Sequence, residues 1–277
     1  MFDVFKKIPV GRFLILNKNP LAVFTKPWKD LSLTELAKFV SDLGADGIEF
    51  PVRDGFQIEP QEADVKLPQF VKLMQEFGLK VFSVASSTDE KIFAGCAEAG
   101  IPLIRIMVKI DEKIGYMETE KKVRQELEEK VIPLCEKYGI KVGIQHHYGN
   151  YICNAMGLTH LIENLDPKHI GAIWDSAHSA LCGEEPELGL DIVWSHLCMV
   201  NFKNAFYLRA NGPEAEVAQW KRYFTTGRQG LASWPRVMDF LKKNGYEGVI
   251  CLTAEYTKEE QVERLIREDI GFIKSLL

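Results

Sequence analysis

The sequence predicts an α/β protein of the (β/α)8 TIM-barrel class, folded as a single domain over residues 21–277. Strand-like and helix-like segments alternate about every thirty residues, which is the rhythm of a parallel sheet covered by helices. Eight such pairs fit into 277 residues, a length typical of this barrel. No linker rich in Gly, Ser or Pro divides the chain, and residues 1–20 are predicted to form an N-terminal extension.

The eight predicted strands are short apolar runs that recur at regular intervals. They cover 21–25, 46–50, 79–85, 102–108, a run that begins at Ile140, 169–174, 197–202 and 248–254. The predicted helices cover 32–43, 65–77, 88–99, 118–138, 158–164, 188–194, 234–243 and 259–276, with a further helical piece at 215–223. Ser32 and Glu35 have the spacing of a capping box at the start of the first helix, and Gly44 is expected to end it.

The composition, 46% hydrophobic and 26% charged, is that of a globular protein with a large core. Six cysteines are scattered without Cys-x-x-Cys spacing, which indicates a reducing compartment, the cytoplasm. No apolar run reaches the roughly 18 residues of a membrane span, and no signal peptide is expected. Because the net charge is -5, we expect no nucleic-acid partner.

Polar side chains gather at the C-terminal ends of the predicted strands. Gln145, Asp175, Asn201 and Glu255 take the inward phase of the period-two pattern along their strands. The outward phase predicts packing against the helices for Val142, Ile144, Ala172, Trp174, Cys198, Val200, Ile250 and Leu252. Barrel enzymes carry their active sites at the C-terminal ends of the strands, so this cluster predicts the functional site.

Four short motifs follow one another on predicted strands two, five, six and eight. They are LGADGIE at 43–49, YGIKVGIQHH at 138–147, DSAH at 175–178, and GYEG at 245–248, which runs on to Glu255. Their order and spacing resemble the xylose isomerase-like TIM-barrel superfamily, in its sugar phosphate isomerase/epimerase branch. The resemblance implies a metal-assisted isomerase or epimerase that acts on a small sugar or polyol derivative by proton abstraction next to a carbonyl.

The resemblance also implies a divalent metal held by residues from strands five to eight. In that family the ligands are Glu, Asp, His and Glu, and the matching positions here are Gln145, Asp175, Asn201 and Glu255. Gln145 and Asn201 depart from the pattern, since an amide offers only an oxygen and cannot act as a base. An oxygen-only set with two carboxylates predicts Mn²⁺ or Mg²⁺, with His147 as an alternative ligand.

The predicted catalytic residues are Glu255, His147, His178 and Lys203. Glu255 is the carboxylate left for proton abstraction, and a histidine of ordinary pKa, about 6.5, can serve as the partner acid or base. Lys203 can stabilise an oxyanion. A Glu/His pair suits elimination, so a metal-assisted lyase or dehydratase on a keto-sugar or keto-glycoside is an open alternative. A catalytically degenerate sugar-binding protein is another, because two ligand positions carry amides.

The predicted substrate-binding residues, for a carbohydrate, are Glu49, Arg105, Phe206 and Arg228. Glu49 and Arg105 end strands two and four, whereas Phe206 follows strand seven and can stack on a sugar ring. Arg228 lies in an insertion that is expected to form a lid or an oligomer contact, so a homo-oligomer is left open. A DNA-repair endonuclease of the same superfamily is not expected, because strands two and three carry no histidine.

Overall fold

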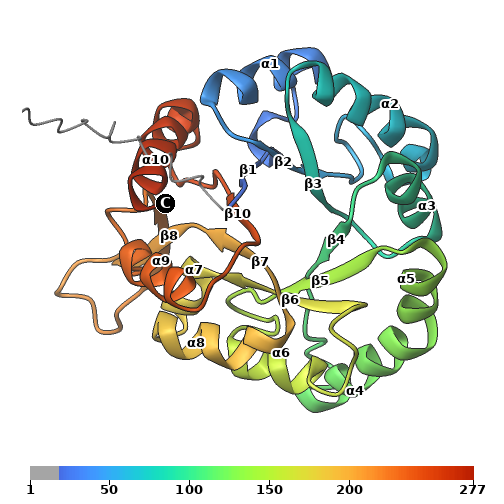
Figure 1. Ribbon diagram of the computed structural model, residues 1–277. Coiled ribbons are helices and arrows are strands. Elements are labelled where there is room, and N and C mark those ends of the chain that lie inside the picture. The colour runs from blue at the N-terminus through green and yellow to red at the C-terminus, as the bar shows by residue number, and fades with distance from the viewer. Residues whose placement is uncertain (1–18) are drawn as a thin grey trace, which may run out of the picture.

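The structure, a computed structural model, describes residues 19–277 and contains a closed barrel of eight parallel strands (Figure 1). Around the barrel the strands lie in the order β1, β10, β7, β6, β5, β4, β3, β2. Their bounds are β1 Leu21–Phe24, β2 Gly47–Pro51, β3 Lys80–Ala85, β4 Leu103–Ile106, β5 Lys141–Gln145, β6 Ile170–Asp175, β7 Leu197–Phe202 and β10 Val249–Leu252. The predicted (β/α)8 barrel, formed by a single domain, is confirmed.

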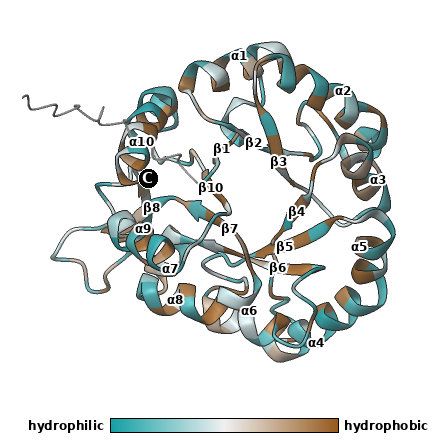
Figure 2. Ribbon diagram, in the orientation of Figure 1, coloured by the Kyte–Doolittle hydropathy of each residue, from teal (hydrophilic) through white to brown (hydrophobic). Residues whose placement is uncertain are grey.

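Helices surround the barrel (Figure 1), and each carries hydrophilic and hydrophobic residues along its turns (Figure 2). They are α1 Leu33–Leu43, α2 Ala63–Glu76, α3 Glu90–Ala99, α4 Tyr116–Glu126, α5 Ile132–Tyr138, α6 Ala155–Ile162, α7 Ser176–Leu181, α8 Pro186–Val193, α9 Trp234–Lys243 and α10 Val262–Leu276. The Ser32–Glu35 capping box is present, and Gly44 ends α1 with a φ of 70°. Within residues 19–277 no helix is long and apolar enough to cross a membrane.

Two helical regions differ from the sequence prediction in detail. The predicted helix at 118–138 is a continuous helical run in which a π-helical segment, Leu127–Val131, joins α4 to α5. The short helix α7 was not predicted, because only six residues separate the end of β6 from Cys182, which follows α7. That helix begins directly at the end of a barrel strand, so it belongs to the wall of the barrel mouth.

The barrel strands separate two apolar layers. The outer layer packs under the helices and includes Val142, Ile144, Ala172, Trp174, Val200, Ile250 and Leu252, as predicted. Ile173, Met199 and Cys251 belong to the inner layer. Cys198, which was predicted to face outward, packs against this inner layer, so that prediction was wrong. The ladder between β6 and β7 shifts register after Ala172, and Cys198 is the extra residue of that irregularity.

An antiparallel hairpin follows β7 and is formed by β8 (Asn204–Arg209) and β9 (Trp220–Thr225). The helical piece predicted at 215–223 was therefore wrong. Aromatic and β-branched residues in this segment favour a strand once a partner strand is available. Phe206 and Tyr223 stack across the hairpin with ring centroids 5.1 Å apart. The loop that joins the two strands projects outward from the ring of helices (Figure 1).

The predicted N-terminal extension falls mostly on residues 1–18, which lie outside the described residues. Asn19, the first described residue, is buried and donates hydrogen bonds from its amide to the carbonyl oxygens of Tyr246 and Gly248, at 2.9 Å and 3.1 Å. The carbonyl of Pro20 accepts from the backbone nitrogen of Ile250 at 2.9 Å. Residues 19 and 20 therefore attach the chain to the segment that leads into β10.

Candidate active site at the barrel mouth

A cavity of about 810 Å³ opens where the barrel strands end. Three of the predicted catalytic residues, His147, Lys203 and Glu255, line it from the segments that follow β5, β7 and β10. Lys26, which follows β1, and Phe224 of β9 complete this part of the wall. His147 and Glu255, two of the groups predicted to move protons, therefore share one solvent-accessible space with Lys203 at the C-terminal ends of the strands, the face where this fold carries its chemistry. His178, the third such group, is buried and does not line this cavity.

A chain of buried polar side chains crosses the barrel from β2 to β6. The Nε of Arg105 donates to Glu49 Oε1 at 2.7 Å, and its Nη1 donates to Gln145 Oε1. The amide Nε2 of Gln145 donates in turn to Asp175 Oδ2 at 2.7 Å. Burial acts to lower the pKa of Arg105, but Glu49 outweighs it and the pKa is raised, so the guanidinium stays charged. Both ends of the Gln145 amide are therefore already engaged.

Asp175 is both the last residue of β6 and the N-cap of α7. Its Oδ1 accepts hydrogen bonds from the backbone nitrogens of Ala177 and His178, both at 3.1 Å. Burial raises the pKa of Asp175, and the nearby Lys203 ammonium opposes that shift. The Asp-x-x-His spacing places His178 in the first turn of the helix, with its Nε2 3.8 Å from Asp175 Oδ2.

Lys203 interacts with three other polar side chains of the site. Its Nζ donates to Glu255 Oε2 at 2.8 Å, lies 3.0 Å from His178 Nε2 and is 4.0 Å from Asp175 Oδ2. Burial acts to lower the pKa of Lys203, but Glu255 and Asp175 outweigh it and raise the pKa, so the ammonium is retained. Since an ammonium only donates, His178 accepts at Nε2 and carries its hydrogen on Nδ1. Burial and Lys203 hold the pKa of His178 well below its usual value, so this ring is neutral.

His147 is the neutral base of the cavity. Its Nδ1 lies 2.9 Å from the carbonyl oxygen of Tyr148, which can only accept, so Nδ1 carries the hydrogen and Nε2 keeps a free lone pair. The ring packs against His178 and Tyr151, with centroids 4.1 Å and 4.7 Å apart. Burial, followed by Lys203, lowers the pKa of His147. The ring is therefore unprotonated at neutral pH and held in one orientation.

Glu255 is anchored by two lysines. Lys26 Nζ donates to its Oε1 at 2.6 Å, and Lys203 donates to its Oε2. Burial acts to raise the pKa of Glu255, but Lys203 and Lys26 outweigh it and hold the pKa well below its usual range. The residue before it, Ala254, is the only non-glycine between 19 and 277 with a positive φ, at 53°. Such a conformation is strained for a residue with a side chain and is typical of functional sites.

The predicted metal ligands lie near one another but do not fit a divalent cation. The Gln145 oxygen faces Arg105, and the Lys203 ammonium lies within 4.0 Å of both carboxylates, Asp175 and Glu255. Among the described residues, no group of three or more His, Cys, Asp or Glu side chains is arranged to hold a metal ion. The fully buried amide of Asn201 has no hydrogen-bond partner in residues 19–277, which suits a hydroxyl group or a water molecule that both donates and accepts.

Two predicted substrate-binding residues lie apart from this cluster. Phe206 stacks on Tyr223 within the hairpin, and the exposed Arg228 packs over the ring of Phe272 at 3.8 Å. Glu49 and Arg105, by contrast, belong to the polar chain across the barrel. The structure thus brings the predicted catalytic and metal-ligand residues together and leaves Phe206 and Arg228 outside, where their predicted roles stay predictions.

Four residues that the sequence did not single out also line the mouth: Lys26, Tyr148, Phe224 and Arg53. Arg53 lies with Arg105 in a second cavity, of about 430 Å³. Burial and the charge of Arg105 lower the pKa of Arg53. Lys26 and Arg53 follow the ends of β1 and β2, and that position was the available signal. Phe224 could not be found, because residues 220–223 of its strand were predicted to be helical and no hairpin was expected.

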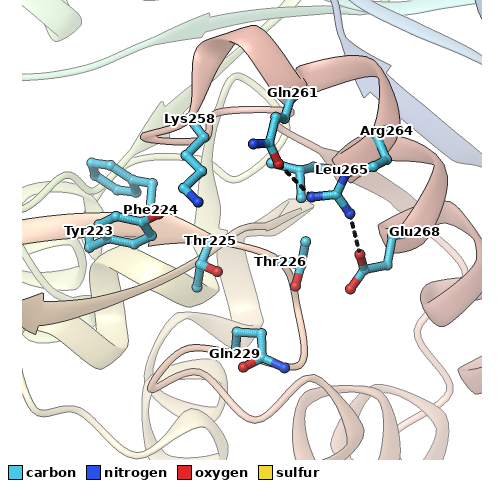
Figure 3. Close-up of a pocket in the computed structure, with 10 residues that line it drawn as sticks. All are labelled: Tyr223, Phe224, Thr225, Thr226, Gln229, Lys258, Gln261, Arg264, Leu265 and Glu268. Atoms are coloured by element: carbon cyan, nitrogen blue, oxygen red, sulfur yellow. Dashed lines mark hydrogen bonds and ion pairs between the residues drawn. The ribbon is translucent and has the colours of Figure 1, made fainter.

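A third cavity, of about 300 Å³, lies between β9 and α10 (Figure 3). Its lining consists of Tyr223, Phe224, Thr225, Thr226, Gln229, Lys258, Gln261, Arg264, Leu265 and Glu268. Arg264 donates to Gln261 at 2.6 Å and is 3.5 Å from Glu268. None of the predicted site residues, all of which lie within 19–277, lines this cavity, although it shares Phe224 with the cavity that contains His147 and Lys203.

Comparisons with known proteins agree with this architecture. A family model described as xylose isomerase-like TIM barrel matches residues 37–276. An inosose dehydratase of Lactiplantibacillus plantarum is 29% identical over 127 residues, a match that spans 44% of this chain and 42% of that protein. The probable 3-DHS dehydratase of Bacillus anthracis has a TM-score of 0.71 at 12% identity, covering 92% of this chain and 98% of that one. The 3-keto-D-glucoside 4-epimerase of E. coli has a TM-score of 0.70 at 14% identity, covering 93% and 99%. These two likenesses concern the fold.

Proposed function

Since the chain belongs to the xylose isomerase-like TIM-barrel family, we propose that it moves a proton next to the carbonyl of a small oxidised sugar or polyol, and that the reaction is elimination of water. The observation that carries this proposal is the neutral ring of His147, with Nε2 free, in the same cavity as the Lys203 ammonium. A base and a fixed positive charge are what removal of a proton beside a carbonyl requires.

In the proposed reaction, His147 Nε2 removes a proton from the carbon next to the carbonyl. Negative charge develops on the carbonyl oxygen, where the Lys203 ammonium donates a hydrogen bond. The bond from the neighbouring carbon to its hydroxyl then breaks, and the hydroxyl leaves with the proton returned by His147 as water. A conjugated double bond remains, and His147 is neutral again. The unpartnered amide of Asn201 is available to hold another hydroxyl of the substrate.

Elimination fits the site better than epimerisation does. An epimerase that inverts a carbon through two bases needs a second proton carrier, and Glu255 is the remaining candidate. Both of its oxygens are paired with lysines, Lys26 and Lys203, which hold its pKa low and weaken it as a base. The similarity to an inosose dehydratase over part of its length supports the same choice. Isomerisation stays the second candidate, because one base, His147, can carry a proton between neighbouring carbons.

The predicted Mn²⁺ or Mg²⁺, with Gln145, Asp175, Asn201 and Glu255 as ligands, stays a prediction. The residues present do not fit it, because the Gln145 amide is engaged at both ends and an ammonium lies beside both carboxylates. Every step of the proposed reaction uses side chains of the protein itself.

The test is to incubate the purified protein with a panel of keto-polyols and keto-sugars in D₂O and to follow the products by NMR and ultraviolet absorbance. A dehydratase yields a product with a new conjugated double bond, and its absorbance rises with time. An isomerase or epimerase instead yields a product that has lost no water and that carries deuterium at the exchanged carbon. Ligand binding with neither product nor exchange would indicate the sugar-binding alternative. His147→Gln is the control, since it removes the proposed base.

A further inference from the structure

The three buried or half-buried carboxylates at the barrel mouth are matched by three cations from the chain itself. Glu49 pairs with Arg105 at 2.7 Å, and Glu255 pairs with Lys26 at 2.6 Å and with Lys203 at 2.8 Å. Asp175 has Lys203 at 4.0 Å. The charges of these six side chains therefore cancel one another before any ion is added.

Lys203 lies at the point where its positive charge acts on both carboxylates of the predicted metal site. Its Nζ bridges Glu255 and Asp175, and His178 Nε2 accepts from the same ammonium at 3.0 Å. The aromatic ring of Phe224 covers the ammonium, with its centroid 5.1 Å from Nζ. With the side chain 3% exposed, this charge is fixed in place by its partners.

We propose that the Lys203 ammonium takes the place of a divalent cation in this protein, and that the site works without a metal. The proposal deepens the proposed function and rests on it for the chemistry, since Lys203 would supply the positive charge that faces the developing oxyanion. The claim that no divalent ion binds between Asp175 and Glu255 does not depend on the reaction, because it is argued from the contacts of Lys203 and Gln145.

The amide substitutions support the same conclusion. At two positions where the family resemblance expects Glu and His, this chain has Gln145 and Asn201, which bear no charge and coordinate only through oxygen. Gln145 could face an ion only by breaking its contacts with Arg105 and Asp175. A dication would also lie next to the buried Lys203 ammonium, where little water is present to screen the repulsion between like charges. The missing charged ligands and the Lys203 ammonium thus both disfavour binding of a divalent cation at this site.

The experiment measures Mn²⁺ binding to the full-length protein by electron paramagnetic resonance, in which bound Mn²⁺ loses the sharp signal of the free ion. We expect no saturable binding by the wild-type protein at millimolar Mn²⁺, and no change of melting temperature on adding EDTA. The restoring variant combines Gln145→Glu, Asn201→His and Lys203→Ala. We expect it to bind one Mn²⁺ with a dissociation constant at least about tenfold below the highest Mn²⁺ concentration at which the wild type shows no binding, because it regains the charged ligands and loses the ammonium. Lys29→Ala, at an exposed lysine of the same cavity, is the matched control and should behave as the wild type does.

A second measurement uses Lys203→Ala alone and needs no metal ligand to be rebuilt. If the ammonium is the cation of the site, an added alkylammonium ion should raise the melting temperature of this variant and leave that of Lys29→Ala unchanged. Stoichiometric Mn²⁺ binding by the wild type that disappears in Asp175→Asn overturns the proposal, as does stabilisation of the two lysine variants to the same extent. Neither readout needs a substrate, so the absence of turnover would count against the proposed function alone. Turnover that EDTA abolishes would count against the metal-free site alone.

Discussion

The imidazole ring centroids of His147 and His178 lie 4.1 Å apart, and both rings are uncharged at neutral pH because their pKa values are lowered. The two rings have different tasks. His178 accepts from Lys203 and is fully buried, whereas His147 lines the open cavity with one nitrogen free. The pair therefore consists of a positioning residue and a proposed base.

Replacing the proposed base should separate activity from stability. We expect His147→Gln to lower kcat by about 10² to 10⁴, the usual contribution of a general base, with little change in the free energy of unfolding. The measurement is steady-state kinetics on the substrate found in the panel, together with urea unfolding. His160→Gln, at a half-exposed histidine on α6, is the control. Equal activities for His147→Gln and the wild type would remove His147 from the mechanism.

The Glu49–Arg105 pair should be a strong determinant of stability. The two side chains are 0% and 5% exposed, so Arg105→Met leaves the Glu49 carboxylate buried without its cation. We expect this variant to lose about 3–5 kcal/mol of unfolding free energy, and Glu49→Leu combined with Arg105→Met to recover a large part of it. Urea denaturation of both variants checks the prediction. A double variant that is less stable than Arg105→Met alone would show that the pair is not the source of the effect.

Asp269 should make stability depend on pH. It accepts from the Gly227 nitrogen at 2.7 Å and the Tyr256 hydroxyl at 2.8 Å, and burial raises the pKa of Asp269 to about 7. A carboxyl with a folded-state pKa above its unfolded value, about 3.9, stabilises the fold fully below that value and loses this contribution as pH rises through the folded-state pKa. We expect the unfolding free energy of the wild type to fall between about pH 4 and about pH 7, and that of Asp269→Asn to fall less. Urea unfolding at a series of pH values tests this, and parallel curves would contradict it.

The sequence and the structure indicate different phenylalanines of the hairpin as the residue that contacts the substrate. Phe224 lines the cavity over Lys203, whereas Phe206 stacks on Tyr223. We expect Phe224→Ala to raise KM about tenfold by removing a wall of the binding cavity, which corresponds to about 1.4 kcal/mol. Phe206→Ala should leave KM unchanged. The reverse order in steady-state kinetics would restore Phe206 as the substrate-binding residue of the sequence prediction.

Local patterns in the sequence were sufficient for most of the fold. The Ser32–Glu35 box and Gly44 act through neighbouring atoms, so the ends of α1 could be predicted. The hairpin could not be predicted, because β8 and β9 stabilise each other only as a pair. Ten residues separate the two strands, so the pairing is not evident from the sequence. Cys198 was misplaced for a similar reason, since one extra residue in β7 reverses the alternation of side chains.

The sequence predicted which strands carry the residues of the candidate site, but not which side chains contact one another. Strand ends placed Gln145, Asp175 and Lys203 at one face, because all parallel strands end together. The partners of each side chain depend on where long side chains reach across the barrel, and the sequence contains no signal for that distance. Gln145 bonding to both Arg105 and Asp175 is such a contact, and so is Lys26 reaching Glu255.

The lysines on either side of Glu255 come from distant parts of the sequence, at positions 26 and 203. β10 lies between β1 and β7 in the barrel, and the carboxylate that follows it joins Lys26, after β1, to Lys203, after β7. These contacts span the seam where the last strand enters the sheet. A chain synthesised from its N-terminus therefore lacks the carboxylate that joins the two lysines until β10 is in place. The charge arrangement of the site is complete only when the barrel has closed. Binding of a ligand at the mouth would therefore indicate that the barrel is closed.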